Sequence, residues 1–405
     1  VELTEGENFV LDSALDVNSG NNERVGVSYK SLPEDVKRGD TLLLDDGRIV
    51  LWVDDVEGTE VRCRVQVGGA LSDRKGINRK GGGLSAPALT DKDRADIKVA
   101  AQIKADYVAV SFPRCAEDMN EARRLLREAG GNGGLVAKIK RSEAIVPEVL
   151  TEIITASDVI MIARGDLGVE IGDAALPPVQ KYVIKVAREM NRVVITATQM
   201  MDSMIHSQIP TRAEVFDVAN AVFDGTDAVM LSAETAAGDF PDKAIAAMDR
   251  ICRVAEQQSV TMVSDHRINT EFQRIDEAIA MACMYAANHL DVKAIAALTE
   301  SGSTPLWMSR ISSGIAIYAL TPHVETRRRV TLYRGVYPIS FDVKTNDHGE
   351  ANKEAVDELK RRGVVRDGDL VIITKGDLMG IHGGTNAMKI VTVGDDLLPS
   401  EIREI

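Results

Sequence analysis

The chain has 405 residues, of which 44% are apolar and 27% are charged, a composition typical of soluble globular proteins with more than one domain. The formal net charge of −14 argues against non-specific binding to nucleic acid or anionic membranes, and no apolar run approaches the roughly 18 residues of a membrane span. The four cysteines are widely separated and form no Cys-x-x-Cys pair, which argues against a zinc site or a disulfide framework and favours a reducing, cytoplasmic location.

Residues 1 to about 80 are predicted to form a small all-β domain. Apolar and polar residues alternate through residues 41–69, and Asp46-Gly47 and Glu57-Gly58 interrupt the alternation. An Asp-Gly pair between apolar runs is typical of a β-hairpin. The following segment, RKGINRKGGGLSAP at 74–87, is rich in glycine and lysine and is predicted to be a linker or hinge.

Between about residues 85 and 255, short apolar runs alternate with amphipathic helical segments. The runs lie at 106–112, 134–140, 158–166, 192–199 and 227–235. This spacing, roughly 25–35 residues, is typical of parallel βα units. Polar residues stand at the carboxyl end of every run: Ser111, Lys138, Lys140, Arg164, Asp166, Thr198, Gln199, Ser232 and Glu234. Active sites of barrels and doubly wound sheets are built at this edge, so the pattern predicts a functional site there.

The segment SDVIMIARGDLGVEIG at 157–172 brings a buried strand directly to Arg164-Gly165-Asp166. Read alone, it allows a simple turn, an extracellular adhesion tripeptide, or a strand that delivers Asp166 to a catalytic edge. The cysteine content weakens the adhesion alternative, because that reading needs an exported protein.

From about residue 275 onward, an α/β pattern resumes. A helical segment at 275–290 precedes strand-like runs at 292–298, 315–320, 335–341, 369–375 and 387–393, which predicts a separate parallel or mixed sheet. The loop LTESGSTPLWMSR at 298–310 offers hydroxyls and backbone N–H groups. It is either a phosphate cradle or a simple capped turn.

Several separate segments resemble the pyruvate kinase family. They are KGIN at 75–78, AKIK at 137–140, MIARGDLGVEI at 161–171, ITATQMMDSM at 195–204 and PTRAEVFDVANAVFDGTDAVMLSAETAAGDFP at 210–241. The resemblance, closest to the bacterial type stimulated by sugar phosphates or AMP, implies an α/β fold. This fold has a β lid at 1–80, a (β/α)8 catalytic domain at 81–258 and an α/β effector domain at 259–405. Five of the eight barrel strands are expected here, with the first three preceding Val1.

The resemblance implies transfer of the phosphoryl group of phosphoenolpyruvate to ADP, giving pyruvate and ATP, by a cytoplasmic homotetramer. Lys138 matches the lysine that stabilises the transition state, and Asp166 matches a ligand of Mg²⁺ or Mn²⁺. Gly165 would bind the substrate carboxylate through its amide, and Thr198 would bind substrate and relay a proton. Lys75 matches a lysine that binds ATP phosphates. K⁺ is a further expected cofactor, whose ligands lie in segments not found in this sequence.

One position departs from the family pattern. The family's Lys-Ile-Glu, whose glutamate is the second metal ligand, is replaced by Lys138-Ile139-Lys140. Side chains two apart on a strand point the same way, so Lys140 is expected at the same site as Lys138. Either Lys140 swings out to solvent and leaves Asp166 as the only protein carboxylate, or its ammonium replaces the charge of the metal. Glu143 is not expected to substitute, because it lies past the strand end.

The effector site implied by the resemblance lies in the loop after the first strand of the C-terminal domain. Its candidate residues are Thr299, Ser301, Gly302, Ser303, Thr304 and Arg310, with Ser312 and Ser313 nearby. Glu300 stands where some relatives carry a phosphate-binding lysine, which favours a monophosphate activator over a diphosphate. Two alternatives remain: another Mg²⁺-dependent barrel enzyme of enolate or phosphoenolpyruvate chemistry, and a catalytically impaired relative that only binds metabolites.

Overall fold

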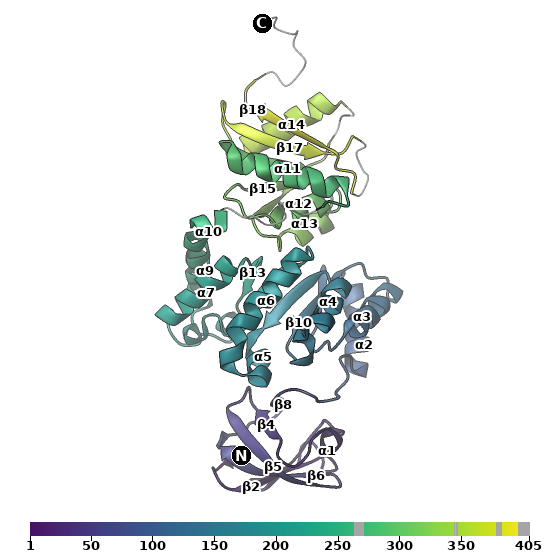
Figure 1. Ribbon diagram of the computed structural model, residues 1–405, viewed down its shortest axis with the longest axis vertical. Coiled ribbons are helices and arrows are strands. Elements are labelled where there is room, and N and C mark those ends of the chain that lie inside the picture. Colours follow the sequence, from purple (N-terminus) through teal and green to yellow (C-terminus); the bar gives the residue numbers. More distant parts are fainter. Residues whose placement is uncertain (263–270, 344, 346, 378–382, 396–405) are drawn as a thin grey trace, which may run out of the picture. The chain divides into compact units, whose positions relative to one another are not determined.

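A computed structural model describes residues 1–262, 271–343, 345, 347–377 and 383–395 (Figure 1). The chain divides into two compact units, one comprising Val1–Arg192 with Thr196–Gln199 and the other Val193–Ile195 with Met200–Ile405. In the part that the structure describes, no helix is long and apolar enough to cross a membrane.

The first 80 residues form a small β structure, as predicted. A six-stranded sheet has the order β3-β2-β6-β5-β4-β8, and β1 pairs with β7. Apolar side chains of alternate strand positions, including Phe9, Leu42 and Leu51, build its core. The elements are β1 (Glu2–Leu3), β2 (Asn8–Asp12), β3 (Arg24–Gly26), α1 (Leu32–Asp35), β4 (Thr41–Leu44), β5 (Ile49–Glu57), β6 (Glu60–Val67), β7 (Gly69–Ala70) and β8 (Ile77–Arg79).

Both predicted hairpins are present in this sheet. β4 and β5 are antiparallel and joined by a turn in which Asp45, Asp46 and Gly47 all have positive φ. β5 and β6 are joined at Gly58, which also has positive φ. Asp and Gly are the residue types that tolerate this conformation, which explains why the hairpins could be recognised from the sequence.

The central region contains the expected five strands, in the sheet order β13-β12-β11-β10-β9. β10 pairs in parallel with β9 and with β11. All residues of β11 and β12 are buried, as expected for strands covered on both faces. The strands are β9 (Tyr107–Val110), β10 (Gly134–Ile139), β11 (Val159–Ala163), β12 (Val193–Ala197) and β13 (Ala228–Met230).

Helices follow these strands in turn, in the βα alternation of a (β/α)8 barrel. Capping boxes begin two of these helices, α2 at Thr90 and α7 at Thr211. The helical elements are α2 (Asp91–Gln102), α3 (Ala116–Glu128), η1 (Glu143–Ile145), α4 (Pro147–Ala156), α5 (Arg164–Ile171), η2 (Asp173–Ala175), α6 (Leu176–Glu189), η3 (Asp202–Ile205), α7 (Arg212–Asp224), α8 (Ala233–Ala236) and α9 (Pro241–Glu256).

The C-terminal region forms a second α/β sheet, in the order β16-β15-β14-β17-β18. β14 lies in the centre and pairs in parallel with β15 and β17, whereas β18 runs antiparallel to β17 at one edge. The elements are α10 (Ser259–Met262), α11 (Ile275–His289), β14 (Val292–Leu298), α12 (Ser303–Ser309), β15 (Ile317–Thr321), α13 (Val324–Val330), β16 (Val336–Ser340), α14 (His348–Arg361), β17 (Leu370–Lys375) and β18 (Ala387–Thr392).

Candidate active site

The carboxyl ends of β10 and β11 bring the predicted lysines and Asp166 into one place. The two strands are in register, with Lys138 opposite Met161 and Ile139 opposite Ile162. Asp166 lies in the first turn of α5, which begins directly after β11. The strand-to-helix transition therefore carries Asp166 to the edge at which Lys138 and Lys140 emerge.

Lys140 does not swing out to solvent. Its Nζ lies 3.1 Å from Asp166 Oδ2, and its side chain is only 12% exposed. The same ammonium lies 4.3 Å from the centre of the Phe112 ring, in a cation–π contact. Of the two expected positions of Lys140, the structure has the one in which its ammonium sits against Asp166. Phe112, which follows β9, was not singled out from the sequence, because an aromatic residue at a strand end reads as ordinary core.

Lys138 lies beside this ion pair and is partly buried. Burial lowers the pKa of Lys138, the positive charge of Lys140 lowers it further, and the carboxylate of Asp166 acts in the opposite direction. In the described part of the chain, the Lys138 ammonium has no hydrogen-bond or ion-pair partner. It is therefore a cation available for an anionic ligand.

Gly165 and Thr198 are joined directly. The backbone N–H of Gly165 donates to Thr198 Oγ1 at 2.8 Å, and this hydroxyl donates to the carbonyl of Ala197. Thr198 has a φ of 68°, which is rare for a β-branched residue, and Gln199 has a φ of 53°. The Arg164 guanidinium donates to the carbonyls of Thr198 and Gln199, so this buried arginine holds the strained turn.

The glycine run that follows β8, which the sequence predicted to be a hinge, contacts the helix α5. Gly81, Gly82 and Gly83 all have positive φ, and a Cβ on Gly82 would lie 2.1 Å from Ser142 Oγ. Gly81 N–H donates to the backbone carbonyl of Glu170, and Gly83 N–H donates to the carboxylate of Glu143. The Glu143 carboxylate is thus engaged by the backbone of this glycine run.

Glu170 is a functional candidate that the sequence reasoning missed. Its carboxylate accepts hydrogen bonds from the Ser142 N–H at 2.8 Å and from the Asn78 amide at 3.3 Å. Burial raises the pKa of Glu170, although these two hydrogen bonds act to lower it. A buried acidic residue four positions after Asp166 on one helix could have been noticed from the helical spacing.

Glu234 and Lys75 both have partners within the chain. Glu234 is buried and accepts hydrogen bonds from the N–H groups of Met201 and Ser232, so it shapes the loop after β13. Lys75 lies between β7 and β8, and its ammonium is 2.7 Å from Asp45 Oδ1.

The residues at this edge do not fit a divalent cation. Asp166 is already paired with an ammonium, and no group of three or more His, Cys, Asp or Glu side chains suited to a metal occurs among the residues that the structure describes. Mg²⁺ requires hard oxygen donors, and Lys140 offers none.

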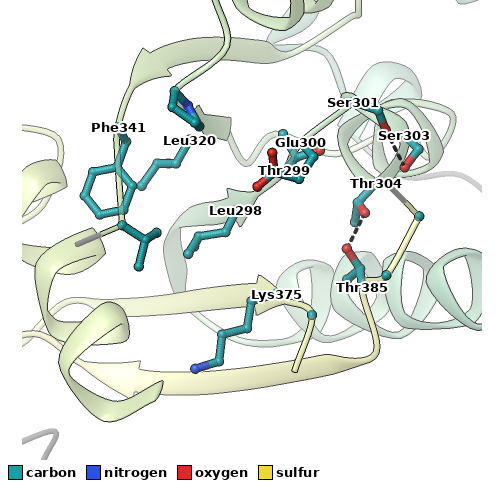
Figure 2. A pocket seen from close by; sticks show the side chains of 15 residues that line it. Leu298, Thr299, Glu300, Ser301, Ser303, Thr304, Leu320, Phe341, Lys375 and Thr385 are labelled. Atoms are coloured by element: carbon teal, nitrogen blue, oxygen red, sulfur yellow. Dashed lines mark hydrogen bonds between the residues drawn. The ribbon is translucent and has the colours of Figure 1, made fainter. Parts of the chain in front are cut away.

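The candidate effector loop lines a pocket in the C-terminal domain (Figure 2). Ser301 and Ser303 are linked through their hydroxyls, Thr304 bonds Thr385, and Thr299 Oγ1 accepts from Gly302 N–H. The Lys375 ammonium turns away from these hydroxyls and donates to the carbonyl of His348. Glu300 also lines the pocket and pairs with His323.

Arg310 corrects one expectation about this pocket. It is fully buried and does not line the pocket, because its guanidinium pairs with the buried carboxylate of Asp227. Asp227 also accepts hydrogen bonds from the N–H groups of Arg334 and Val194. Arg310 is therefore a structural residue here and is not exposed to an effector.

Comparisons with known proteins agree with the fold and with the resemblance of the motifs. A family model described as "Pyruvate kinase, barrel domain" matches residues 1–245, and one described as "Pyruvate kinase, alpha/beta domain" matches residues 277–391. The chain therefore belongs to the pyruvate kinase family, which is a family of enzymes, and both the expected family and the expected fold are confirmed.

Individual relatives cover nearly all of the chain. Pyruvate kinase II of Salmonella typhimurium is 56% identical over 395 residues, which are 97% of this chain and 82% of the relative. Pyruvate kinase of Buchnera aphidicola subsp. Acyrthosiphon pisum is 55% identical over 393 residues, 96% of this chain and 82% of the relative. Pyruvate kinase of Thermotoga maritima is 40% identical over 393 residues, 97% of this chain and 82% of the relative.

Proposed function

We propose that the protein transfers the phosphoryl group of phosphoenolpyruvate to ADP, giving pyruvate and ATP in the last step of glycolysis. The observation that carries the proposal is the cluster at the carboxyl ends of β10, β11 and β12, where a free lysine and a threonine held in a strained turn flank Asp166. The high identity to pyruvate kinases over nearly the whole chain supports it.

The proposed roles follow from the positions of the groups. The Lys138 ammonium binds the moving phosphoryl group and the developing enolate oxygen, both of which are negatively charged in the transition state. Thr198 contacts the substrate carboxylate, and Gly165 positions the Thr198 hydroxyl by donating its N–H to it. The same hydroxyl ends a path by which a proton reaches the enolate carbon. Lys75 contacts the nucleotide phosphates when the β domain closes over the site.

The cofactor requirement of this chain differs from the family's general one. Enzymes of the family generally use Mg²⁺ and K⁺. Because Lys140 pairs with Asp166, no step of the proposed mechanism is assigned to a divalent metal. The same observation favours a second candidate function, that of a catalytically impaired relative that binds metabolites without efficient turnover.

We also propose activation through the C-terminal pocket by a phosphorylated metabolite. Thr299, Ser301, Ser303 and Thr304 line one side of the pocket with their hydroxyl groups, and Gly302 stands between them with its N–H donated to Thr299 Oγ1. Glu300 places a carboxylate there, which opposes a diphosphate more strongly than a monophosphate. Sugar monophosphates or AMP are therefore expected to bind, and tight binding of fructose 1,6-bisphosphate alone would contradict this.

The deciding experiment is a coupled assay of ATP formation from phosphoenolpyruvate and ADP, with and without Mg²⁺ and K⁺. Turnover supports the proposed function and removes the metabolite-binding alternative. No turnover under any combination of cations refutes it. The proposal includes a cytoplasmic homotetramer, which light scattering at micromolar concentration tests by the mass that it returns.

A further inference from the structure

Two lysines and one aspartate share the carboxyl edge of β10 and β11, and their charges do not cancel. Lys140 is paired with Asp166, while the neighbouring Lys138 has no polar partner in the described part of the chain. The cluster of Lys138, Lys140 and Asp166 therefore has one positive charge left over, in a partly buried place at the strand ends. Such a charge is suited to an anion.

We propose that Lys140 is a tethered cation that takes the place of a divalent metal at Asp166, and that Lys138 and Lys140 together bind the anionic groups of the substrate without a divalent cation. This inference rests on the proposed function, because it concerns the substrate site of that reaction. It assigns to this chain a way of binding phosphoenolpyruvate that does not depend on Mg²⁺.

The position of the Lys140 ammonium is fixed from two sides. Asp166 Oδ2 lies 3.1 Å from it, and the face of the Phe112 ring lies 4.3 Å from it on another strand end. A lysine that merely avoided the site would extend into water, since its long side chain keeps its charge hydrated wherever it can. At 12% exposure the Lys140 side chain does not do so.

A divalent metal and this ammonium exclude one another. A Mg²⁺ ion bound to Asp166 Oδ2 would lie roughly 2.1 Å from that oxygen. Because the Lys140 Nζ lies 3.1 Å from the same oxygen, the metal and the ammonium could never be more than about 5 Å apart. Like charges at that distance repel strongly in a partly buried site, so Mg²⁺ can enter only if Lys140 leaves.

The test measures binding rather than turnover. Calorimetric titration of the whole chain with phosphoenolpyruvate is done in EDTA and in Mg²⁺, and Mn²⁺ binding is followed by electron paramagnetic resonance. We expect phosphoenolpyruvate affinities in EDTA and in Mg²⁺ to agree within about twofold, with no Mn²⁺ bound at sub-millimolar concentration. Lys140→Glu should bind Mn²⁺ at sub-millimolar concentration and lose at least tenfold in phosphoenolpyruvate affinity in EDTA.

Lys140→Gln is the matched control, because it removes the ammonium without adding a carboxylate. It should lose phosphoenolpyruvate affinity in EDTA without the full Mn²⁺ affinity of Lys140→Glu, and thermal unfolding checks that each variant is folded. The inference is overturned if the unsubstituted chain needs Mg²⁺ to bind phosphoenolpyruvate, binds it under neither condition, or binds Mn²⁺ as tightly as Lys140→Glu does. These outcomes are separate from the coupled assay, since a chain that binds phosphoenolpyruvate without metal but makes no ATP refutes only the proposed function.

Discussion

Replacement of Arg310 by methionine should destabilise the C-terminal unit severely. Arg310 is wholly buried, and both it and Asp227 have side chains that are 1% exposed. The guanidinium donates to both carboxylate oxygens of Asp227, with Nη1 at 3.0 Å from Oδ2. Methionine retains most of the aliphatic volume, so the main change in Arg310→Met is the loss of the charge that neutralises Asp227.

The expected loss of stability depends on the hydrogen-bond donors and charges that remain near the Asp227 carboxylate. After the substitution, the donors that remain on its carboxylate among the described residues are the N–H groups of Arg334, at 3.0 Å, and Val194, at 2.9 Å, with the Arg334 guanidinium as the remaining nearby positive charge. Removing one partner of a buried ion pair generally costs about 3–5 kcal/mol, because the other charge stays buried without its main counter-charge. We expect Arg310→Met to lower the free energy of unfolding by that amount. A second substitution, Asp227→Asn, should restore part of it by removing the stranded charge.

Tryptophan fluorescence can follow this unit by itself. The chain contains two tryptophans, Trp52 in β5 and Trp307 in α12, so a Trp52→Phe background leaves Trp307 as the reporter of urea unfolding. Arg253→Met is the control, since Arg253 and Asp249 form an exposed pair on α9 and its loss should leave the transition unchanged. A loss below about 1 kcal/mol in Arg310→Met, or a double variant no more stable than the single one, would refute the reasoning.

Three further outcomes are expected. Lys140→Glu should raise turnover by orders of magnitude at high Mg²⁺. The reason is that an ammonium about 4 Å from a divalent ion is repelled by roughly 8 kcal/mol at an effective dielectric of about 20. Equal steady-state rates and equal Mg²⁺ dependence in the two proteins would contradict this. Hydrogen bonds from Arg361 and Arg362 lower the pKa of Glu358 to about 2, so its stabilisation is present above its ordinary pKa and is lost as pH falls through about 2. The difference in Tm between the protein and Glu358→Gln should therefore shrink across that range, and a difference that does not vary with pH would refute it. Gly82→Ala should push the hinge away from Ser142 and speed amide exchange in residues 81–85, whereas unchanged exchange would show that this contact does not hold the hinge.

The order of elements could be predicted from the sequence because it is encoded locally. The Asp46-Gly47 hairpin and the five strand-like runs each depend on residues within a short window, and all of them occur in the structure. The strand-end residues could be predicted for the same reason, since the carboxyl edge of a βα repeat follows from chain direction alone.

Partners that are distant in the chain could not be predicted in this way. Arg310 lies in a loop motif that resembles an anion site, but its partner Asp227 is 83 positions away and nothing local signals that the arginine is buried. Likewise, the two-residue spacing on one strand predicted that Lys140 lies at the same edge as Lys138, but it did not predict which groups the Lys140 ammonium contacts. Those contacts are with Phe112 and Asp166, which follow two other strands.

The helix α5 lies between the candidate substrate site and the predicted hinge of the β region. Asp166 and Glu170 are four residues apart on this eight-residue helix and therefore lie on the same face. Asp166 is held by Lys140, and Glu170 is held by Asn78 from the β domain and by Ser142 from the loop after β10. Because both sets of contacts hold the same short helix, we expect the loss of one set to weaken the other. A substitution of Lys140 should therefore affect both the neutralisation of the Asp166 charge and the contacts that hold residues 81–85. Amide exchange in residues 81–85 of Lys140→Gln measures the effect on these contacts separately from the effect on the charge.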